Sequence, residues 1–111
     1  MTSSSWQVRL SAEALNDFRL IVTYSADKFG RVKAAAYSGL LREALASLEQ
    51  GPNVPGSAAR DEILPDLRSL HVSRKGRRGS HFILYRAVVP GVIEVLRLLH
   101  DAMDLRRHLP G

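Results

Sequence analysis

Hydrophobic and polar residues alternate near the start of the chain, and the period then lengthens to that of a helix. The alternation over residues 6–10, with Trp6, Val8 and Leu10 on one side, predicts a half-buried strand. Ser11 follows at the position of a helix N-cap, and an amphipathic helix is predicted over residues 12–29. The apolar positions that support this helix are Leu15, Phe18, Ile21, Val22 and Phe29.

A second helical pattern begins directly after Gly30, which supplies the break between the two helices. This helix is predicted over residues 31–50, and Gly51 and Pro52 end it. Its apolar face consists of Tyr37, Leu40, Leu41, Ala44, Leu45 and Leu48. Because the connection is so short, the two helices must fold back on each other as an antiparallel hairpin.

The remainder of the chain has the period of strands. Residues 51–67 contain three prolines and two glycines, which indicates a surface loop. Alternation from Arg68 to Ser73 predicts a strand, and residues 81–89 and 92–99 are apolar on both faces, as in the central strands of a sheet. Proline at the first central position of the 90–91 turn does not suit the tightest hairpins, so a longer or bulged turn is expected. Asp101 is expected to cap a short helix that covers residues 102–108.

The predicted order is strand, helix, helix, three strands and a short helix, which indicates an α+β fold in two layers. A helical hairpin should cover one face of an antiparallel sheet. Residues 1–5 are expected to be a disordered lead-in, and residues 6–109 a single domain.

The charge is unevenly distributed along the chain. Residues 1–67 carry seven Lys and Arg against eight Asp and Glu, whereas residues 68–111 carry nine against three, a net of +6. A cationic C-terminal half suits an acidic partner, either nucleic acid or an acidic protein segment. The alternative is a basic domain whose charges only keep it in solution.

Several kinds of chemistry have little support in the sequence. There is no cysteine, and the four histidines lack the spacing of a metal site, so we expect neither a metal nor a cofactor. No Gly-x-Ser-x-Gly motif points to a hydrolase. No apolar run reaches the roughly 20 residues that a membrane span requires, and residues 1–5 do not resemble a secretory signal, so a cytoplasmic location is expected.

The last thirty residues carry a resemblance to a known family. The segments Ile83-Leu84-Tyr85-Arg86, Val95-Leu96-Arg97-Leu98-Leu99-His100 and Met103-Asp104 resemble the C-terminal core of the RelE/ParE toxins of bacterial type II toxin–antitoxin modules. The likeness extends over residues 6–109. RelE-like nucleases usually carry a C-terminal tyrosine or a His-Tyr pair, whereas His100 is followed by Asp101 and no tyrosine follows Tyr85. The resemblance is therefore closer to the ParE branch.

Resemblance to ParE implies a non-catalytic inhibitor of DNA gyrase that a cognate antitoxin neutralises in a hetero-oligomeric complex. The antitoxin's tail would be acidic and fold on binding, and contact with DNA would come mainly through the antitoxin. The alternative is a RelE-like ribosome-dependent mRNA endonuclease, with His100 or His81 for proton transfer and Arg68, Arg86 and Arg97 for phosphate charge. A third possibility is a module member that binds its antitoxin but is no longer toxic.

The residues expected to contact the target or the antitoxin are mostly cations of the C-terminal half. They are Arg68, Arg74, Lys75, Arg77, Arg78, Arg86, Arg97, His100, Asp104, Arg106 and Arg107. Each has a simpler interpretation. Arg86 and Arg97 could join Glu94 in an internal ion-pair network, and loop 74–80 could be merely solvated. His100 and Asp104, one helical turn apart, could share a structural hydrogen bond, and the three tyrosines could serve core packing.

Overall fold

The structure of the protein is a computed structural model that describes residues 5–109, apart from the side chain of His108. The predicted lead-in, residues 1–5, lies outside the described residues except for Ser5. The helices are α1 (Ala12–Phe29), α2 (Arg31–Ser47) and two short 3-10 helices, η1 (Leu48–Gln50) and η2 (Leu105–His108). The strands are β1 (Gln7–Leu10), β2 (Ser57–Ala59), β3 (Arg68–His71), β4 (His81–Val89) and β5 (Val92–His100).

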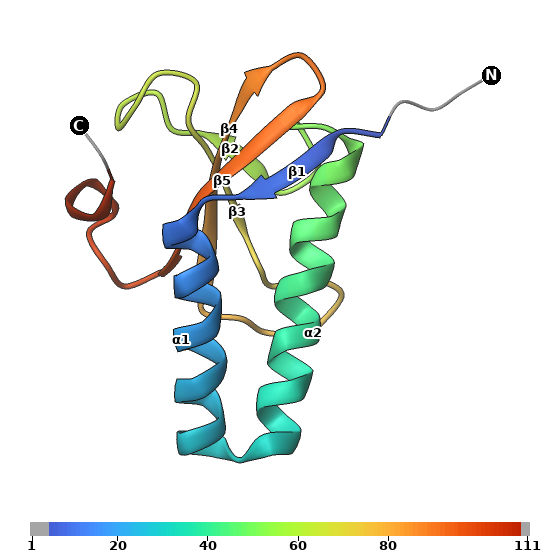
Figure 1. Cartoon of the computed structure of the whole chain (residues 1–111), viewed down its shortest axis with the longest axis vertical. Helices are drawn as coiled ribbons and strands as arrows, with labels where there is room; N and C mark the ends of the chain where they lie inside the picture. The colour runs from blue at the N-terminus through green and yellow to red at the C-terminus, as the bar shows by residue number, and fades with distance from the viewer. Residues whose placement is uncertain (1–4, 110–111) are drawn as a thin grey trace.

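The helical hairpin forms as its sequence predicts. Ser11 caps α1, since its hydroxyl accepts a hydrogen bond from the Ala14 amide at 3.0 Å. The same hydroxyl donates to the Leu96 carbonyl at 2.9 Å, so the cap also ties α1 to β5. Gly30, at φ +90°, turns the chain directly into α2. Figure 1 shows the two helices side by side in front of the sheet, with the turn between them projecting beyond its lower edge.

The sheet has five strands in the order β1-β5-β4-β3-β2 and corrects the sequence prediction in two ways. First, β1 runs parallel to β5, so the sheet is mixed rather than wholly antiparallel. In the sequence, α1 and α2 separate β1 from the other strands. A connection of this length allows β1 and β5 to run in the same direction. Second, β2 lies inside the loop predicted over 51–67 and pairs antiparallel with β3. Its Ser-Ala-Ala sequence is too small and short to show a strand period.

The main core lies between the hairpin and the sheet. Its buried members include Leu41 and Leu48 of the helical segment and Ile83, Tyr85 and Ile93 of the central strands. A smaller cluster lies on the other face of the sheet, where the loop before β3 and the end of the chain cover Leu84 and Leu99. The members of this second cluster are Ile63, Leu64, Leu67, Leu84, Leu96, Leu99, Leu105 and Leu109. Two cores explain why β4 and β5 are apolar on both faces.

The β4–β5 turn contains only Pro90 and Gly91, so it is not longer than a tight hairpin turn. Gly91 at φ +82° after a proline matches a type II turn, in which the second central residue takes positive φ. The expected irregularity lies beside the turn instead, because the register shifts between Ala87 and Val89. A second shift, between Leu84 and Tyr85, leaves Leu96 of β5 without a cross-strand partner.

The C-terminal helix is shorter than predicted and begins later. Only Leu105–His108 form a helical turn, and the capping side chain is Asp104, which accepts from the Arg106 amide at 3.1 Å. Asp101 does not cap it. The β5 strand extends to His100, and the Asp101 carboxylate binds His71 instead. No helix within residues 5–109 is long and apolar enough to cross a membrane.

Candidate functional site

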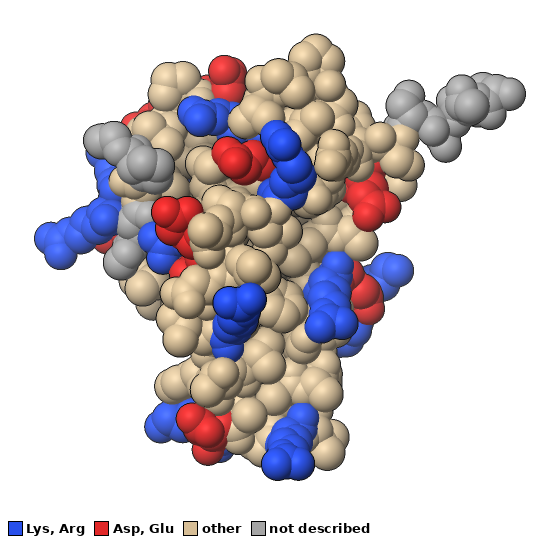
Figure 2. Space-filling model, in the orientation of Figure 1, with Lys and Arg blue, Asp and Glu red and all other residues tan. Residues whose placement is uncertain are grey.

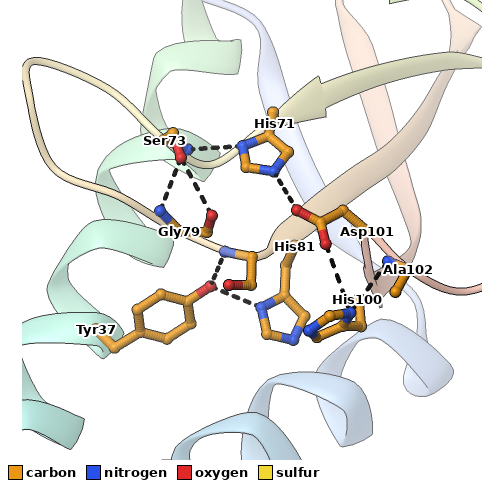
Figure 3. Close-up of polar contacts among 9 residues, drawn as sticks. Tyr37, His71, Ser73, Gly79, His81, His100, Asp101 and Ala102 are labelled. Atoms are coloured by element: carbon orange, nitrogen blue, oxygen red, sulfur yellow. Dashed lines mark hydrogen bonds and ion pairs between the residues drawn. The ribbon is translucent and has the colours of Figure 1, made fainter.

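Three histidines and one aspartate meet at the end of the sheet where β3 and β5 finish and β4 begins. His81 and His100 are cross-strand partners, with ring centroids 5.3 Å apart in an edge-to-face arrangement. His71 lies on the next strand, and its Nε2 is 2.9 Å from the Asp101 carboxylate. Tyr37 reaches this group from α2, as Figure 3 shows. We call Tyr37, His71, His81, His100 and Asp101 the histidine cluster.

Hydrogen bonds to Nδ1 are the basis on which we assign the tautomers of all three imidazoles. The Ser73 amide donates to Nδ1 of His71, at 3.2 Å, and the Ala102 amide donates to Nδ1 of His100, at 3.1 Å. The oxygen of Tyr37 accepts from the Ser80 amide at 2.8 Å, and we assign its own hydrogen to the 2.6 Å hydrogen bond with Nδ1 of His81. In this assignment each Nδ1 is an acceptor and the ring hydrogen of every neutral imidazole is on Nε2. Nδ1 of His100 also lies 3.5 Å from Oδ1 of Asp101, a contact that becomes an ion pair only when the ring is protonated.

The environment favours a neutral His81. Burial lowers the pKa of His81 to about 4, and the neighbouring His100 ring adds to this effect. The His71 hydrogen bond lowers the pKa of Asp101, so the carboxylate stays ionised. Burial raises the pKa of Tyr37, which keeps its hydroxyl protonated and able to donate to His81.

The histidine cluster borders an open groove of about 920 Å³ between the lower half of the helical hairpin and the sheet end. The α1 side supplies three large apolar side chains that are mostly exposed: Leu20 and Tyr24 at 59% and Phe29 at 60%. Lys33 and Arg78 also line the groove, and its lining includes no Asp or Glu. The groove is lined by Leu20, Ile21, Tyr24, Ser25, Phe29, Lys33, Tyr37, Arg78, Ser80, His81 and His100.

The arginines named for nuclease chemistry are not brought together with His100. Arg68 donates to the Pro52 carbonyl at 2.9 Å and to Ser57 Oγ at 2.8 Å, at the far end of β3 from His71. Arg97 forms a two-pronged ion pair with Asp17 of α1. Arg86 lies opposite Glu94 in the β4–β5 register, on the sheet face opposite the helices. Arg97 is therefore directed towards α1, whereas Arg86 is directed away from the helices.

Loop 74–80 begins as a closed turn. Arg74 and Arg77 exchange two backbone hydrogen bonds, and Lys75 and Gly76 between them both have positive φ, at 51° and 77°. The Arg77 guanidinium pairs with Glu43 of α2, and this hydrogen bond lowers the pKa of Glu43. Arg78 instead lines the groove. One nitrogen of Arg74, Nη1, is buried without a hydrogen-bond partner among the described residues.

The C-terminal candidates after His100, which are Asp104, Arg106 and Arg107, do not line the groove. His100 and Asp104 are not one helical turn apart, because His100 ends a strand and Asp104 caps η2. Arg106 and Arg107 are exposed, and Arg107 lies 3.6 Å from Asp104. On the face seen in Figure 2 the cations are scattered, several of them beside an acidic residue, and no continuous basic patch covers the helical hairpin.

We identify neither a candidate metal site nor an assembled set of catalytic side chains among the described residues. No group of three or more His, Asp and Glu within residues 5–109 has the geometry to hold a metal ion. Of the tyrosines, Tyr85 is fully buried with its hydroxyl 2.6 Å from the Pro52 carbonyl, as the core-packing interpretation requires. Tyr24 is exposed, so that interpretation is wrong for Tyr24.

The comparison with protein families agrees with this architecture. A family model described as "ParE toxin of type II toxin-antitoxin system, parDE" matches residues 8–105. The chain belongs to this family. The ParE resemblance seen in the sequence is thereby confirmed, and the protein is a toxin of the type II toxin–antitoxin class.

Individual relatives give the same result. The Caulobacter vibrioides protein named Toxin ParE1 is 38% identical over 101 residues, which are 91% of this chain and 95% of that protein. Toxin ParE1 of Mycobacterium tuberculosis is 35% identical over 83 residues, 75% of this chain and 76% of that protein.

Solved structures share the fold at lower identity. A chain from the chromosomal ParDE toxin–antitoxin system of P. aeruginosa superposes with a TM-score of 0.70 at 22% identity, covering 88% of this chain and 98% of that one. A chain of the RelBE2 toxin–antitoxin complex of Mycobacterium tuberculosis gives a TM-score of 0.54 at 22% identity, covering 86% and 98%. ParE and RelE toxins thus have the α+β fold of this chain in common.

Sequence reasoning missed the histidine cluster as a unit. His71, His81 and His100 are 10 and 19 residues apart, and no motif joins them. One signal was nevertheless present. Two nine-residue strands around a two-residue turn place the first residue of one opposite the last residue of the other, which pairs His81 with His100.

Proposed function

We propose that this ParE-family toxin arrests growth by binding DNA gyrase, without catalytic chemistry of its own, and that a cognate antitoxin neutralises it. The observation that carries the proposal is the dispersal of the candidate nuclease residues. Arg68 and Arg97 serve contacts within the fold, Arg86 lies on the opposite sheet face, and His100 faces the groove without them. Cleavage of RNA requires proton transfer and charge stabilisation at one phosphate, which this arrangement does not favour.

The tautomers of the histidine cluster support the same proposal. A general base needs a free ring nitrogen with a lone pair, whereas each Nδ1 in this cluster already accepts a hydrogen bond. The low pKa of His81, about 4, also makes it a weak base near neutral pH.

The antitoxin is proposed to be a small protein encoded beside this gene, with an acidic tail that folds on binding. Support comes from the exposed apolar side chains of α1 and from the cations that line the groove. A complex would cover this apolar surface, and the C-terminal half, with its net charge of +6, would attract the tail. The described residues have no helix fit for a membrane, and a cytoplasmic location remains part of the proposal.

The test compares His100→Ala with the unaltered chain in two assays, gyrase supercoiling and ribosome-dependent mRNA cleavage. We expect the unaltered chain to inhibit gyrase and leave mRNA intact, and the variant to retain inhibition in proportion to its stability. A general acid or base contributes roughly 100- to 10,000-fold in rate. Codon-dependent cleavage that disappears in the variant would establish the nuclease alternative instead. Antitoxin binding without activity in either assay would indicate a toxin that has lost its toxicity.

A further inference from the structure

The groove contains two hydrogen-bond donors for which the fold provides no acceptor. His81 and His100 each carry a hydrogen on Nε2, because each Nδ1 is occupied as an acceptor. Protonation of either ring would leave that Nε2 hydrogen in place. Among the described residues neither Nε2 has a hydrogen-bond partner. Nε2 of His81 is not fully buried, and the His100 side chain is 51% exposed.

The two rings that carry these donors lie close together and line the same groove. The rings are cross-strand partners 5.3 Å apart, and both line the groove. Figure 3 shows them side by side at the ends of their strands, with Tyr37 on one side and Asp101 on the other. His71 differs from them, because its Nε2 hydrogen is already donated to Asp101.

The surroundings favour a negatively charged acceptor. Lys33 and Arg78 line the same groove, and no carboxylate does. Two adjacent N–H donors with cations nearby suit the two oxygens of a carboxylate, and hydrogen bonds to an ionised acceptor are about twice as strong as neutral ones. The remaining wall, with Leu20, Tyr24 and Phe29 exposed along one side of α1, suits the apolar side chains of a peptide.

We infer that the Nε2–H groups of His81 and His100 together bind the side-chain carboxylate of an Asp or Glu in the antitoxin segment that fills this groove. The inference rests on the antitoxin partnership proposed above and adds its recognition chemistry. Apolar antitoxin side chains flank this acidic residue and cover the α1 wall. Tyr37 acts as a positioning residue, since its hydroxyl holds His81 in the tautomer that directs the donor into the groove.

The first part of the test requires no antitoxin. Long-range proton–nitrogen NMR spectra of the full chain are recorded during titration with acetate and, separately, with inorganic phosphate. We expect Nε2–H tautomers for His81 and His100, and acetate should shift these two resonances while moving His71 much less. Tyr37→Phe should weaken the acetate response of His81. The Nδ1–H tautomer at either ring, or no response to acetate, would overturn the inference. A response to phosphate alone would overturn it in favour of a nucleic-acid phosphate.

The second part measures affinity for the product of the adjacent reading frame. His100→Phe keeps a ring but removes the donor, whereas His100→Gln retains an N–H near the position of Nε2. Because the His100 side chain is 51% exposed, both variants should fold. We expect a roughly tenfold loss for Phe and near-normal affinity for Gln, as for the loss of one hydrogen bond to a charged group. Equal affinities for the two variants would overturn this inference alone. Failure of the unaltered chain to bind would overturn the antitoxin partnership as well.

Discussion

The Asp17 carboxylate of α1 holds the Arg97 guanidinium of β5 by two hydrogen bonds, 2.8 Å to Nε and 2.9 Å to Nη2. The same carboxylate accepts from the Leu98 amide at 3.0 Å, and Asp17 is only 8% exposed. Eighty residues separate the partners along the chain. The pair therefore joins the first helix to the last strand, and it gives Arg97, a candidate for target contact, a role within the fold.

Loss of this pair should destabilise the protein. We expect Asp17→Asn to lower the free energy of unfolding by about 2 kcal/mol, because it removes the carboxylate that binds both the Arg97 guanidinium and the Leu98 amide. Asp27→Asn, at an exposed position of the same helix, is the matched control and should change it by no more than about 0.5 kcal/mol. Urea denaturation measures both. Equal effects would mean that the pair is not important for stability.

Stability should also depend on pH through His81. Its folded-state pKa, about 4, lies below the usual value of 6.5, so between these values the unfolded chain binds a proton that the folded chain excludes. Stability should therefore fall as the pH is lowered from about 6.5 towards 4. His81→Gln should flatten this part of the profile, whereas losses at still lower pH, where Asp101 becomes protonated, should remain. An NMR titration giving His81 an ordinary pKa would contradict this prediction.

Substitution of two glycines by alanine should change the stability of the protein in opposite directions. Gly39 lies inside α2, and a Cβ atom added there would meet no other heavy atom within 4 Å, so Gly39→Ala should stabilise the protein by roughly 0.5–1 kcal/mol. A Cβ atom at Gly79 would overlap Val72 Cγ2, so Gly79→Ala should destabilise the protein by about 1–3 kcal/mol. Thermal unfolding of the two variants tests both signs.

Charge reversal at Arg77 and at the adjacent Arg78 should affect antitoxin association to different extents. The charge of Arg77 is offset by Glu43, whereas Arg78 lines the groove. We expect Arg78→Glu to slow antitoxin association and flatten its salt dependence, because attraction between opposite charges is lost, and Arg77→Glu to have a smaller effect. Association rates at two salt concentrations measure this. Growth arrest that weakens with unchanged antitoxin binding would assign Arg78 to the gyrase complex instead.

Helices and strands were predicted well where a hydrophobic period or a capping residue specifies them. Ser11 and Gly30 bound α1 at the predicted residues, and the apolar runs of β4 and β5 begin where expected. Parallel pairing of β1 with β5 could not be predicted, because strand direction depends on the path through the helical hairpin rather than on residue pattern. Asp101, the predicted cap, instead binds His71, a contact between distant residues that the sequence pattern does not reveal, and η2 begins after Asp104.

The alignment of His81 with His100 depends on two register shifts that cancel each other and are not evident from the sequence. One irregularity near Val88 on β4 shifts the register, and another at Leu96 on β5 shifts it back. His81 and His100 therefore face each other as they would in a regular hairpin. Either bulge alone would misalign the two rings, so the pair requires both.

Titration of purified toxin against a fixed amount of DNA gyrase tests the central claim most directly. A non-catalytic inhibitor should reduce supercoiling in proportion to the toxin added, reach a plateau once gyrase is saturated, and leave cleaved DNA in the reaction. Adding the antitoxin should restore supercoiling. Undiminished supercoiling at a large molar excess of toxin, together with cleavage of ribosome-bound mRNA by the same preparation, would contradict the account.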